Sequence, residues 1–240
     1  MKIAFISDIH GNATALEAVL NDIKNEDVDK IYVLGDICFR GPEPKRALQL
    51  VRSLGTEVIK GNTDEWLVRG IADGEAREDE LEMLEQERQW TLQRLDEDDL
   101  DYLKSLPTEA VVEDGLDLII HAFHATPSSL FETVQADETN EIEDKIMLLD
   151  DADIYVYGHT HRPFVRTLHG KSVVNTGGVG MSFDGQALAS YAIVEIGEGR
   201  HRIQINRVPY HREHVVELFK QGRYPNTEAM SRVIFYGVTP

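Results

Sequence analysis

Seven side chains of metal-ligating type follow short apolar segments of this sequence, and most have a glycine close by. They are aspartates, histidines and one asparagine, which offer hard oxygen or imidazole ligands and no thiolate. Such a set suits divalent Mn, Fe, Zn or Ni. The seven residues are Asp8, His10, Asp36, Asn62, His124, His159 and His161.

The order of these side chains predicts two metal ions at one site. The first ion would be held by Asp8, His10 and His161, and the second by Asn62, His124 and His159. Asp36 is placed to bridge the pair. Two divalent ions roughly 3.5 to 4 Å apart would lower the pKa of a bridging water and clamp two oxygens of a phosphoryl group during in-line displacement. The expected chemistry is hydrolysis of a phosphate ester by a metal-bridged hydroxide.

Each motif is weak evidence by itself. An Asp-x-His or Gly-Asn-x-Asp sequence is usually a polar turn, and a surface histidine pair is the simpler interpretation of Gly-His-x-His. The latter is nevertheless stronger, because alternate residues of an extended segment point the same way, so that His159 and His161 would face one site. Ligands of open α/β sheets bind just outside the carboxyl ends of the strands. Polar ligands at five successive predicted strand ends therefore make coincidence improbable.

The elements that must position these ligands alternate between strand and helix in the first 60 residues. Strands are expected over residues 2–7, 31–34 and 57–59. Apolar residues repeat with helical spacing between them, after the N-cap Asn12 in the first helix and from Ala47 in the second. This alternation predicts a parallel sheet with crossover helices.

The rest of the chain completes a single expected domain, residues 1–240. Residues 65–106 are helical in pattern and strongly acidic, and we expect an insertion whose charged residues form a solvated helix face. Further strands are expected over residues 116–123, 154–157, 172–175, 191–196 and 203–208. Helices are expected over residues 138–149 and around Val215 to Phe219.

Composition limits the possible partners and compartments. The chain has 240 residues, 42% hydrophobic, and a net charge of −19, which argues against nucleic acid or an anionic membrane as a partner. An anionic substrate is not excluded, because bound cations reverse the local charge. The one cysteine, Cys38, excludes a disulfide framework and is expected to be a small buried filler. No apolar run has the roughly 20 residues of a membrane helix, and Asp8 comes too early for a signal peptide, so a cytoplasmic location is expected. The sequence predicts no oligomeric state.

The five motifs resemble, in order, those of the calcineurin-like metallophosphoesterase superfamily. Its Asp-x-His, Gly-Asp, Gly-Asn, lone His and Gly-His-x-His motifs run here from Asp8 to His161, and residues 175–180 resemble its glycine-rich closing loop. The size and the Gly41-Pro42 pair resemble the small prokaryotic phosphoesterases. The resemblance implies a two-sheet α/β sandwich flanked by helices, two divalent ions, and a small phosphate-ester substrate. Phosphodiesters are the expected substrates, with monoesters also possible.

One departure from the family concerns proton donation. Many members carry a histidine after the Gly-Asn motif that is proposed to protonate the leaving group, and Thr63 stands there in this chain. A threonine hydroxyl is not an efficient general acid. The resemblance then implies substrates with good leaving groups, or another donor such as His121 or a metal-bound water. Asp64 is expected to orient Asn62 or a nearby histidine.

Two assignments have stated alternatives. His124 is the favoured ligand because the following Ala-Thr-Pro resembles a turn in relatives. His121 lies three residues earlier, where a strand would turn it toward the opposite face as a buried, hydrogen-bonded histidine. Arg40 lies on the loop past Cys38 and is expected to reach a substrate phosphate, the alternative being a surface arginine.

Other functions remain in competition with a phosphodiesterase. They are a phosphoprotein phosphatase, a dinucleoside polyphosphate hydrolase and a non-enzymatic scaffold. The scaffold is disfavoured because no metal ligand is missing. The sequence has no phosphate-binding Gly-x-x-x-x-Gly-Lys-Ser/Thr loop, no Gly-x-Ser-x-Gly motif, and no dinucleotide-binding Gly-x-Gly-x-x-Gly motif after the first strand.

Overall fold

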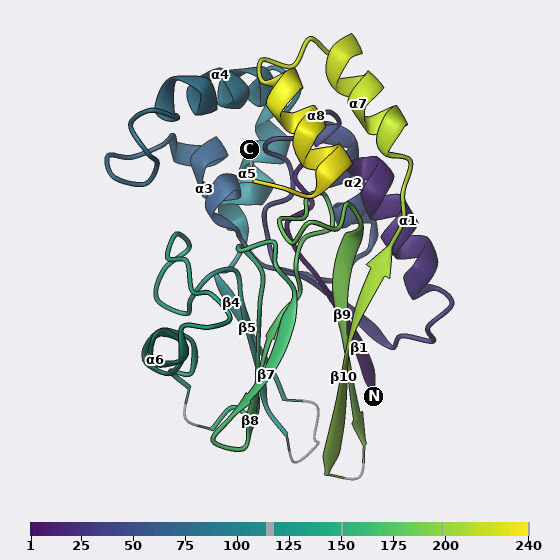
Figure 1. Ribbon diagram of the computed structural model, residues 1–240, viewed down its shortest axis with the longest axis vertical. Coiled ribbons are helices and arrows are strands. Elements are labelled where there is room, and N and C mark those ends of the chain that lie inside the picture. Colours follow the sequence, from purple (N-terminus) through teal and green to yellow (C-terminus); the bar gives the residue numbers. More distant parts are fainter. Residues whose placement is uncertain (114–117, 150, 198, 240) are drawn as a thin grey trace.

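Two mixed five-stranded sheets pack face to face and form the centre of the molecule (Figure 1). The computed structural model describes residues 1–113, 118–149, 151–197 and 199–239. Eight α-helices in those ranges surround the sheets, most of them gathered over one end of the sandwich. This arrangement confirms the expected α/β sandwich.

The first sheet contains the parallel strands that the first 60 residues predict. Its order is β10-β9-β1-β2-β3. The parallel strands are β1 (Lys2–Ile6), β2 (Lys30–Val33) and β3 (Glu57–Val58). The antiparallel pair is β9 (Ala189–Gly197) and β10 (Arg200–Val208). Ile6 pairs with Val33, and Val33 with Val58, so the three parallel strands end at one level.

The second sheet has the order β4-β5-β6-β8-β7. Its parallel strands are β5 (Ile120–Phe123), β6 (Ile154–Tyr157) and β8 (Lys171–Asn175). Its antiparallel edges are β4 (Glu109–Val112) and β7 (Phe164–Leu168). The edge strands were not expected, because half of their side chains face solvent and they lack a continuous apolar run.

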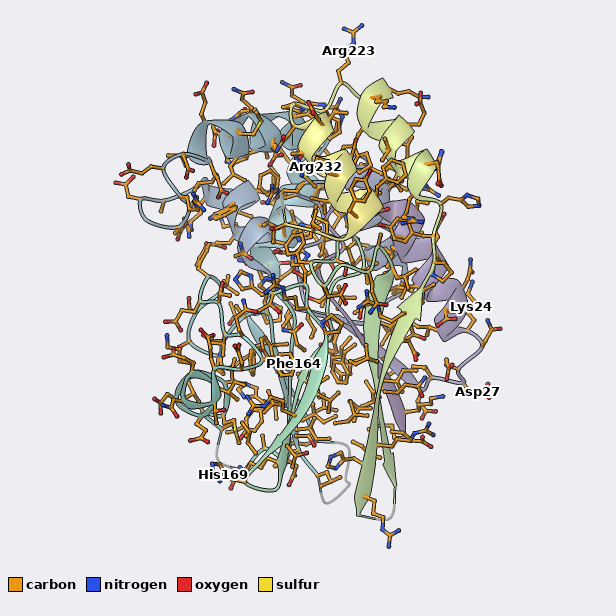
Figure 2. All side chains as sticks on the ribbon, in the orientation of Figure 1. Lys24, Asp27, Phe164, His169, Arg223 and Arg232 are labelled. Atoms are coloured by element: carbon orange, nitrogen blue, oxygen red, sulfur yellow. The ribbon has the colours of Figure 1, made fainter. Side chains whose placement is uncertain are left out.

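An apolar layer joins the two sheets. Phe5 and Leu34 of the first sheet pack in one cluster with Ala122 and Val156 of the second, and all four are fully buried. Figure 2 shows carbon-rich side chains filling this space, whereas the charged side chain of Arg223 projects from the periphery. Burial of apolar surface on this scale is the main favourable term in folding.

The helices cover the outer faces of the sheets and the end where the metal ligands lie. They are α1 (Ala13–Ile23), α2 (Pro44–Ser53), α3 (Asn62–Arg69), α4 (Leu81–Leu92), α5 (Glu97–Ser105), α6 (Thr139–Glu141), α7 (Arg212–Gln221) and α8 (Thr227–Tyr236). Asn12 caps α1 as expected, since its side chain accepts a hydrogen bond from Ala15 N. None of the described helices combines the length and apolar composition of a bilayer span.

Three segments differ from the sequence-based expectations. The strand expected over 116–123 begins at Ile120, and residues 116 and 117 lie outside the described part of the chain. The helix expected over 138–149 is the single turn α6 followed by a π-helical turn, Ile142–Ile146, in which Met147 N donates to Ile142 O. The helix α8 was missed; it buries Met230, Val233 and Ile234 against α7.

Candidate metal centre

The ends of five strands from both sheets meet at one rim of the sandwich. Asp8 N donates to Gly35 O at 3.1 Å, which ties the turn after β1 to the turn after β2. In the second sheet, Gly158 N donates to His124 O at 3.0 Å. Gly158 lies against the first sheet so closely that a Cβ there would be 2.4 Å from Asp8 Oδ2. A glycine is therefore required at this contact.

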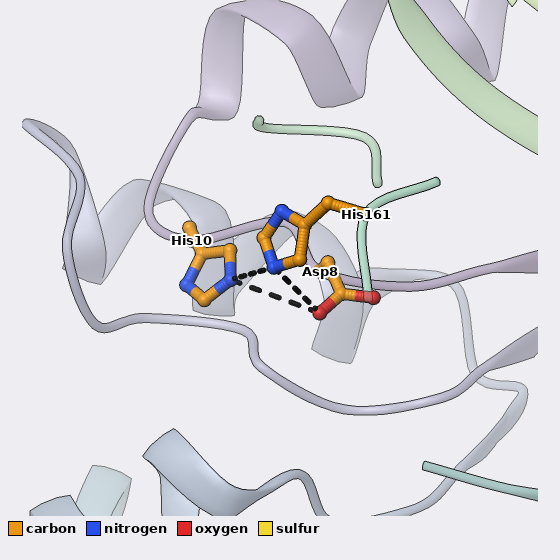
Figure 3. Close-up of side chains that lie close together, drawn as sticks. All are labelled: Asp8, His10 and His161. Carbon is orange, nitrogen blue, oxygen red and sulfur yellow. Dashed lines mark hydrogen bonds and ion pairs between the residues drawn. The ribbon is translucent and has the colours of Figure 1, made fainter. Parts of the chain in front are cut away.

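The first predicted ligand group converges as expected. His161 Nε2 lies 3.2 Å from Asp8 Oδ1 and 3.2 Å from His10 Nε2, and His10 Nε2 lies 3.7 Å from Asp8 Oδ1 (Figure 3). The two imidazole rings stack with centroids 4.9 Å apart. All three residues are buried. These atoms are close enough together to ligate one cation.

Asp36 lies between the first group and the second. Its Oδ2 is 3.5 Å from His10 Nε2 and 3.6 Å from His124 Nε2. The amide oxygen of Asn62 lies 2.9 Å from His124 Nε2 and 3.1 Å from His159 Nδ1. The structure therefore brings all seven predicted ligands together, with the Asp36 carboxylate between the two groups.

The ligand histidines are oriented by the backbone. In three of them Nδ1 faces a carbonyl oxygen. The carbonyls belong to Phe39, Leu34 and Met181, at 2.9, 2.7 and 3.3 Å from His10, His124 and His161 respectively. Because a carbonyl only accepts, Nδ1 carries the proton of the neutral ring, and Nε2 offers a lone pair to the site.

This donor set fits divalent metal ions. With neutral rings, the Nε2 atoms of His10 and His161 face each other as two acceptors. The buried Asp8 Oδ1 has no hydrogen-bond partner among the described residues. Buried polar atoms in proteins are normally paired. A cation between these three atoms would satisfy all of them, and the residues that would hold the ions are the seven named above.

The electrostatics of the site favour the ligating protonation states of Asp8 and His159, whereas at His10 burial lowers the pKa but Asp8 and Asp36 together raise it above its usual value. Burial raises the pKa of Asp8, but the neighbouring His161 and His10 together lower that pKa well below its usual range. Burial lowers the pKa of His159 to about 4, and the nearby His124 adds to this effect. At neutral pH, Asp8 is therefore ionised and His159 neutral, as metal binding requires.

Several ligands adopt a left-handed backbone conformation, which is uncommon outside glycine. They are Asp8, His10, Asp36, His159 and His161, with φ between 48° and 64°. Each lies two to four residues after the end of a strand, in the turns at the rim. Such conformations cost energy and cluster at functional sites.

Asp64 lies behind the ligands and does not line the cavity between them. Its fully buried carboxylate accepts hydrogen bonds from the backbone N–H groups of Asp36 at 2.8 Å, Ile37 at 2.9 Å and Gly61 at 3.0 Å. Burial and the charge of Asp36 raise the pKa of Asp64 to about 6. The residue joins the turns after β2 and β3, and so orients Asp36 rather than Asn62 or a histidine.

A cavity of about 160 Å³, the metal cavity, opens over the ligands. Besides five of the seven ligands, it is lined by Arg40, Thr63, Trp66, Met181 and Phe183. The ring of Phe183 stacks on His161 with centroids 4.3 Å apart. Trp66, Met181 and Phe183 were not predicted from the sequence, although the last two lie within three residues of the glycine-rich segment at 175–180.

The remaining candidates lie as follows. His121 is turned away from the ligands, with its Nε2 2.8 Å from Glu109 Oε2, as the opposite-face interpretation expects. It is thus not brought to the cavity as a proton donor. Arg40 lines the cavity and pairs through Nε with Glu87 Oε2 at 3.2 Å. Cys38 is fully buried, and burial raises the pKa of its thiol.

Comparisons with known proteins agree with this geometry. A family model described as the calcineurin-like phosphoesterase superfamily domain matches residues 1–199. The uncharacterized protein MJ0912 of Methanocaldococcus jannaschii is 31% identical over 255 residues, covering 98% of each chain. The symmetrical bis(5'-nucleosyl)-tetraphosphatase of Erwinia tasmaniensis is 29% identical over 143 residues, which cover 57% of this chain and 49% of that relative.

Solved structures show the same fold. A metallophosphoesterase of Sphaerobacter thermophilus superposes with a TM-score of 0.80 at 27% identity, covering 99% of each chain. The hypothetical protein PH1004 of Pyrococcus horikoshii superposes with a TM-score of 0.85 at 21% identity, covering 100% of this chain and 99% of that one. The similarity thus includes the C-terminal helices that follow residue 199.

Proposed function

This chain belongs to the calcineurin-like metallophosphoesterase superfamily, and from that membership we propose that it is a two-metal hydrolase of phosphodiesters, with monoesters as secondary substrates. The observation that carries the proposal is the position of Asp36 Oδ2, 3.5 Å from His10 Nε2 and 3.6 Å from His124 Nε2. One carboxylate between two ligand groups is the arrangement that a metal pair requires.

When bound, the two ions would supply Lewis acidity and lower the pKa of a water that attacks phosphorus. The protein holds the ligands ready for them. The backbone carbonyls fix the imidazoles with Nε2 toward the cavity. Thr63 N donates to Asp36 Oδ1 at 2.9 Å, which leaves Asp36 Oδ2 for the metal site.

Arg40 is the proposed contact for a substrate phosphate. Its side chain lines the metal cavity. No other arginine among the described residues does so. Guanidinium groups bind phosphate oxygens by charge-assisted hydrogen bonds and stay protonated at all relevant pH values. Arg40 therefore offsets charge on the substrate in an otherwise acidic chain.

The surroundings of Thr63 support a preference for good leaving groups. Apart from the metal ligands, the described lining of the cavity offers no side chain that titrates near neutral pH. Without an efficient acid, the leaving oxygen departs as a weakly basic anion or takes a proton from water. Activated diesters are therefore the expected best substrates.

The test is metal-dependent hydrolysis of bis-p-nitrophenyl phosphate and p-nitrophenyl phosphate. The protein is stripped with chelator and reloaded with Mn, Ni, Fe or Zn, and a metal titration gives the stoichiometry. We expect two ions per chain and faster turnover of the diester. Absence of turnover with every metal, in folded and loaded protein, contradicts the proposal. Fewer than one ion per chain favours the scaffold alternative.

A dinucleoside polyphosphate hydrolase is the second candidate, because the Erwinia tasmaniensis tetraphosphatase is similar over 143 residues. Comparison of kcat/KM for diadenosine tetraphosphate, a cyclic nucleotide and a phosphopeptide separates the candidates. A diadenosine tetraphosphate value far above that for any diester selects the second candidate. A phosphopeptide value above both selects a phosphoprotein phosphatase.

A further inference from the structure

The buried carboxylate of Glu87, on the acidic helix α4, forms an ion pair with Arg40, and Arg40 lines the metal cavity. Glu87 is fully buried, and its Oε2 lies 3.2 Å from Arg40 Nε. On the same helix Glu82 is exposed and Glu85 keeps 45% of its side chain exposed, as acidic residues of a surface helix normally do. A buried charge is costly to fold unless it is paired. Glu87 therefore differs from the other acidic residues of α4.

The C-terminal segment encloses the same ion pair. Met230 Sδ of α8 lies 4.0 Å from Arg40 Nη2. Asn226 and the buried Tyr224 lie near the Glu87 carboxylate, whose two oxygens have no hydrogen-bond partner among the described residues. We call Glu87, Tyr224, Asn226 and Met230 the Arg40 socket. Its last three members lie after residue 199, outside the segment that the family model matches.

The Arg40 socket contacts the guanidinium at Nε and Nη2, and Arg40 also lines the metal cavity. Arg40 keeps 21% of its side chain exposed and lines the cavity, whereas Glu87 has no exposed surface. The backbone of Arg40 is left-handed, with φ of 70°. The next residue, Gly41, packs so tightly on His10 O that any Cβ there would collide with it. Both ends of Arg40 are thus fixed relative to the ligand His10.

We propose that Glu87 is a positioning residue that holds the Arg40 guanidinium toward the substrate phosphate, and that the C-terminal segment completes the socket. This inference rests on the proposed function, in which Arg40 contacts that phosphate. An unpaired arginine has several rotatable bonds and would sample many positions. With Nε at Glu87 and Nη2 at Met230, the Nη1 group is left to meet the phosphate.

The test measures binding of inorganic phosphate to the manganese-loaded protein by calorimetry, together with KM and kcat for bis-p-nitrophenyl phosphate. Glu87→Gln keeps the size of the side chain and removes its charge. We expect phosphate binding to weaken about tenfold, the scale of one charge-assisted hydrogen bond, with a parallel rise in KM. The manganese affinity should change much less, because Glu87 pairs with Arg40 and acts on the ligand His10 only through its charge.

Two further variants separate positioning from general damage. Glu85→Gln makes the same charge change on the exposed face of α4, where Glu85 pairs with Arg88, and should bind phosphate like the unmodified protein. In an Arg40→Gln background, Glu87→Gln should cause no additional loss, because it acts through Arg40. Should Glu87→Gln fail to fold, Glu87→Asp keeps the charge, withdraws the guanidinium by one methylene, and is expected to weaken phosphate binding in the same direction.

The outcomes distinguish this inference from the function on which it rests. Unchanged phosphate affinity in Glu87→Gln, or losses that add to those of Arg40→Gln, overturns the positioning role while the unmodified protein still hydrolyses diesters. An unmodified protein that binds manganese but neither binds phosphate nor hydrolyses any ester overturns both.

Discussion

Replacing Asp36 by asparagine should change stability in opposite directions with and without metal. The substitution keeps the shape of the side chain and an oxygen that can accept the hydrogen bond from Thr63 N. It removes the negative charge that lies between His10 and His124. The loaded protein therefore loses its bridging ligand, while the metal-free protein loses one of several buried acids.

The expected magnitude follows from the energetics of ligand binding. An ion present at 100 times its dissociation constant stabilises the folded chain by about 2.7 kcal/mol. For a chain of this size each kcal/mol shifts the melting temperature by roughly 2 to 4 °C, so one bound ion raises it by about 5 to 11 °C. Asp36→Asn should abolish most of this rise. In chelator, its melting temperature should equal or exceed that of the unmodified protein, because Asp8, Asp36 and Asp64 are buried together without a cation.

The assay is calorimetric melting in chelator and in excess manganese. Asp99→Asn is the matched control, since Asp99 is also a buried acid but pairs with Lys45 away from the cavity. It should lower the melting temperature equally in both conditions and keep the full metal-induced rise. A full metal-induced rise in Asp36→Asn, or a metal-free loss as large as that of Asp99→Asn, refutes the bridging assignment.

Other substitutions test the neighbouring assignments. His124→Ala should lower kcat/KM by about 100-fold or more, and His121→Ala by less than about tenfold, because of the two only His124 faces the other ligands. Equal losses would mean that the ligand is misassigned. Thr63→His should accelerate esters with poor leaving groups by up to about 10²-fold and activated esters much less, and an unchanged dependence on leaving-group pKa across an ester series argues against Thr63 as the missing acid position. Burial raises the pKa of Glu87 above its ordinary value of 4.5, so the folded chain keeps this proton to a higher pH than the unfolded chain does. The free energy of unfolding therefore falls as the pH rises from the ordinary pKa to the raised one. Glu87→Gln should remove this fall in a series of melting curves, whereas Glu85→Gln should retain it.

The convergence of Asp8, Asp36 and Asn62 could be predicted from the sequence because parallel strands end at one level. Once β1, β2 and β3 are recognised, their register places Asp8, Asp36 and Asn62 side by side. The side on which a histidine lies also follows from strand alternation, which separates His121 from the rim. These predictions depend only on the local periodicity of the chain.

The packing of the two sheets against each other could not be predicted from the periodicity of the sequence. His124 and His159 belong to the second sheet, and they reach Asp36 because the sheets stack through contacts such as those of Phe5 and Ala122. No local pattern specifies such a contact, so the sequence supplied it only through the resemblance to a family. The apolar residues that line the metal cavity are also brought there by tertiary packing, so no local pattern predicts them.

The acidic run at 65–106 shows where a compositional argument fails. Its charged residues were expected to form a solvated face, and on α4 the exposed Glu82 and the 45% exposed side chain of Glu85 do so. Glu87 is instead buried, because α4 packs between the turn that carries Arg40 and the C-terminal helices. Composition averages over a helix, whereas burial is decided by the face on which each residue lies.

The left-handed ligands explain how one site can be assembled from such distant segments. A strand that ended in ordinary extended backbone would carry its next side chains past the rim, alternately to either face. The left-handed turns at Asp8, Asp36 and His159 bring the side chains back over the strand ends. Hydrogen bonds between the turns, such as Asp8 N to Gly35 O and His159 N to Asp8 Oδ2, hold this costly conformation. These bonds connect protein atoms only, so the fold itself holds the ligands in this arrangement.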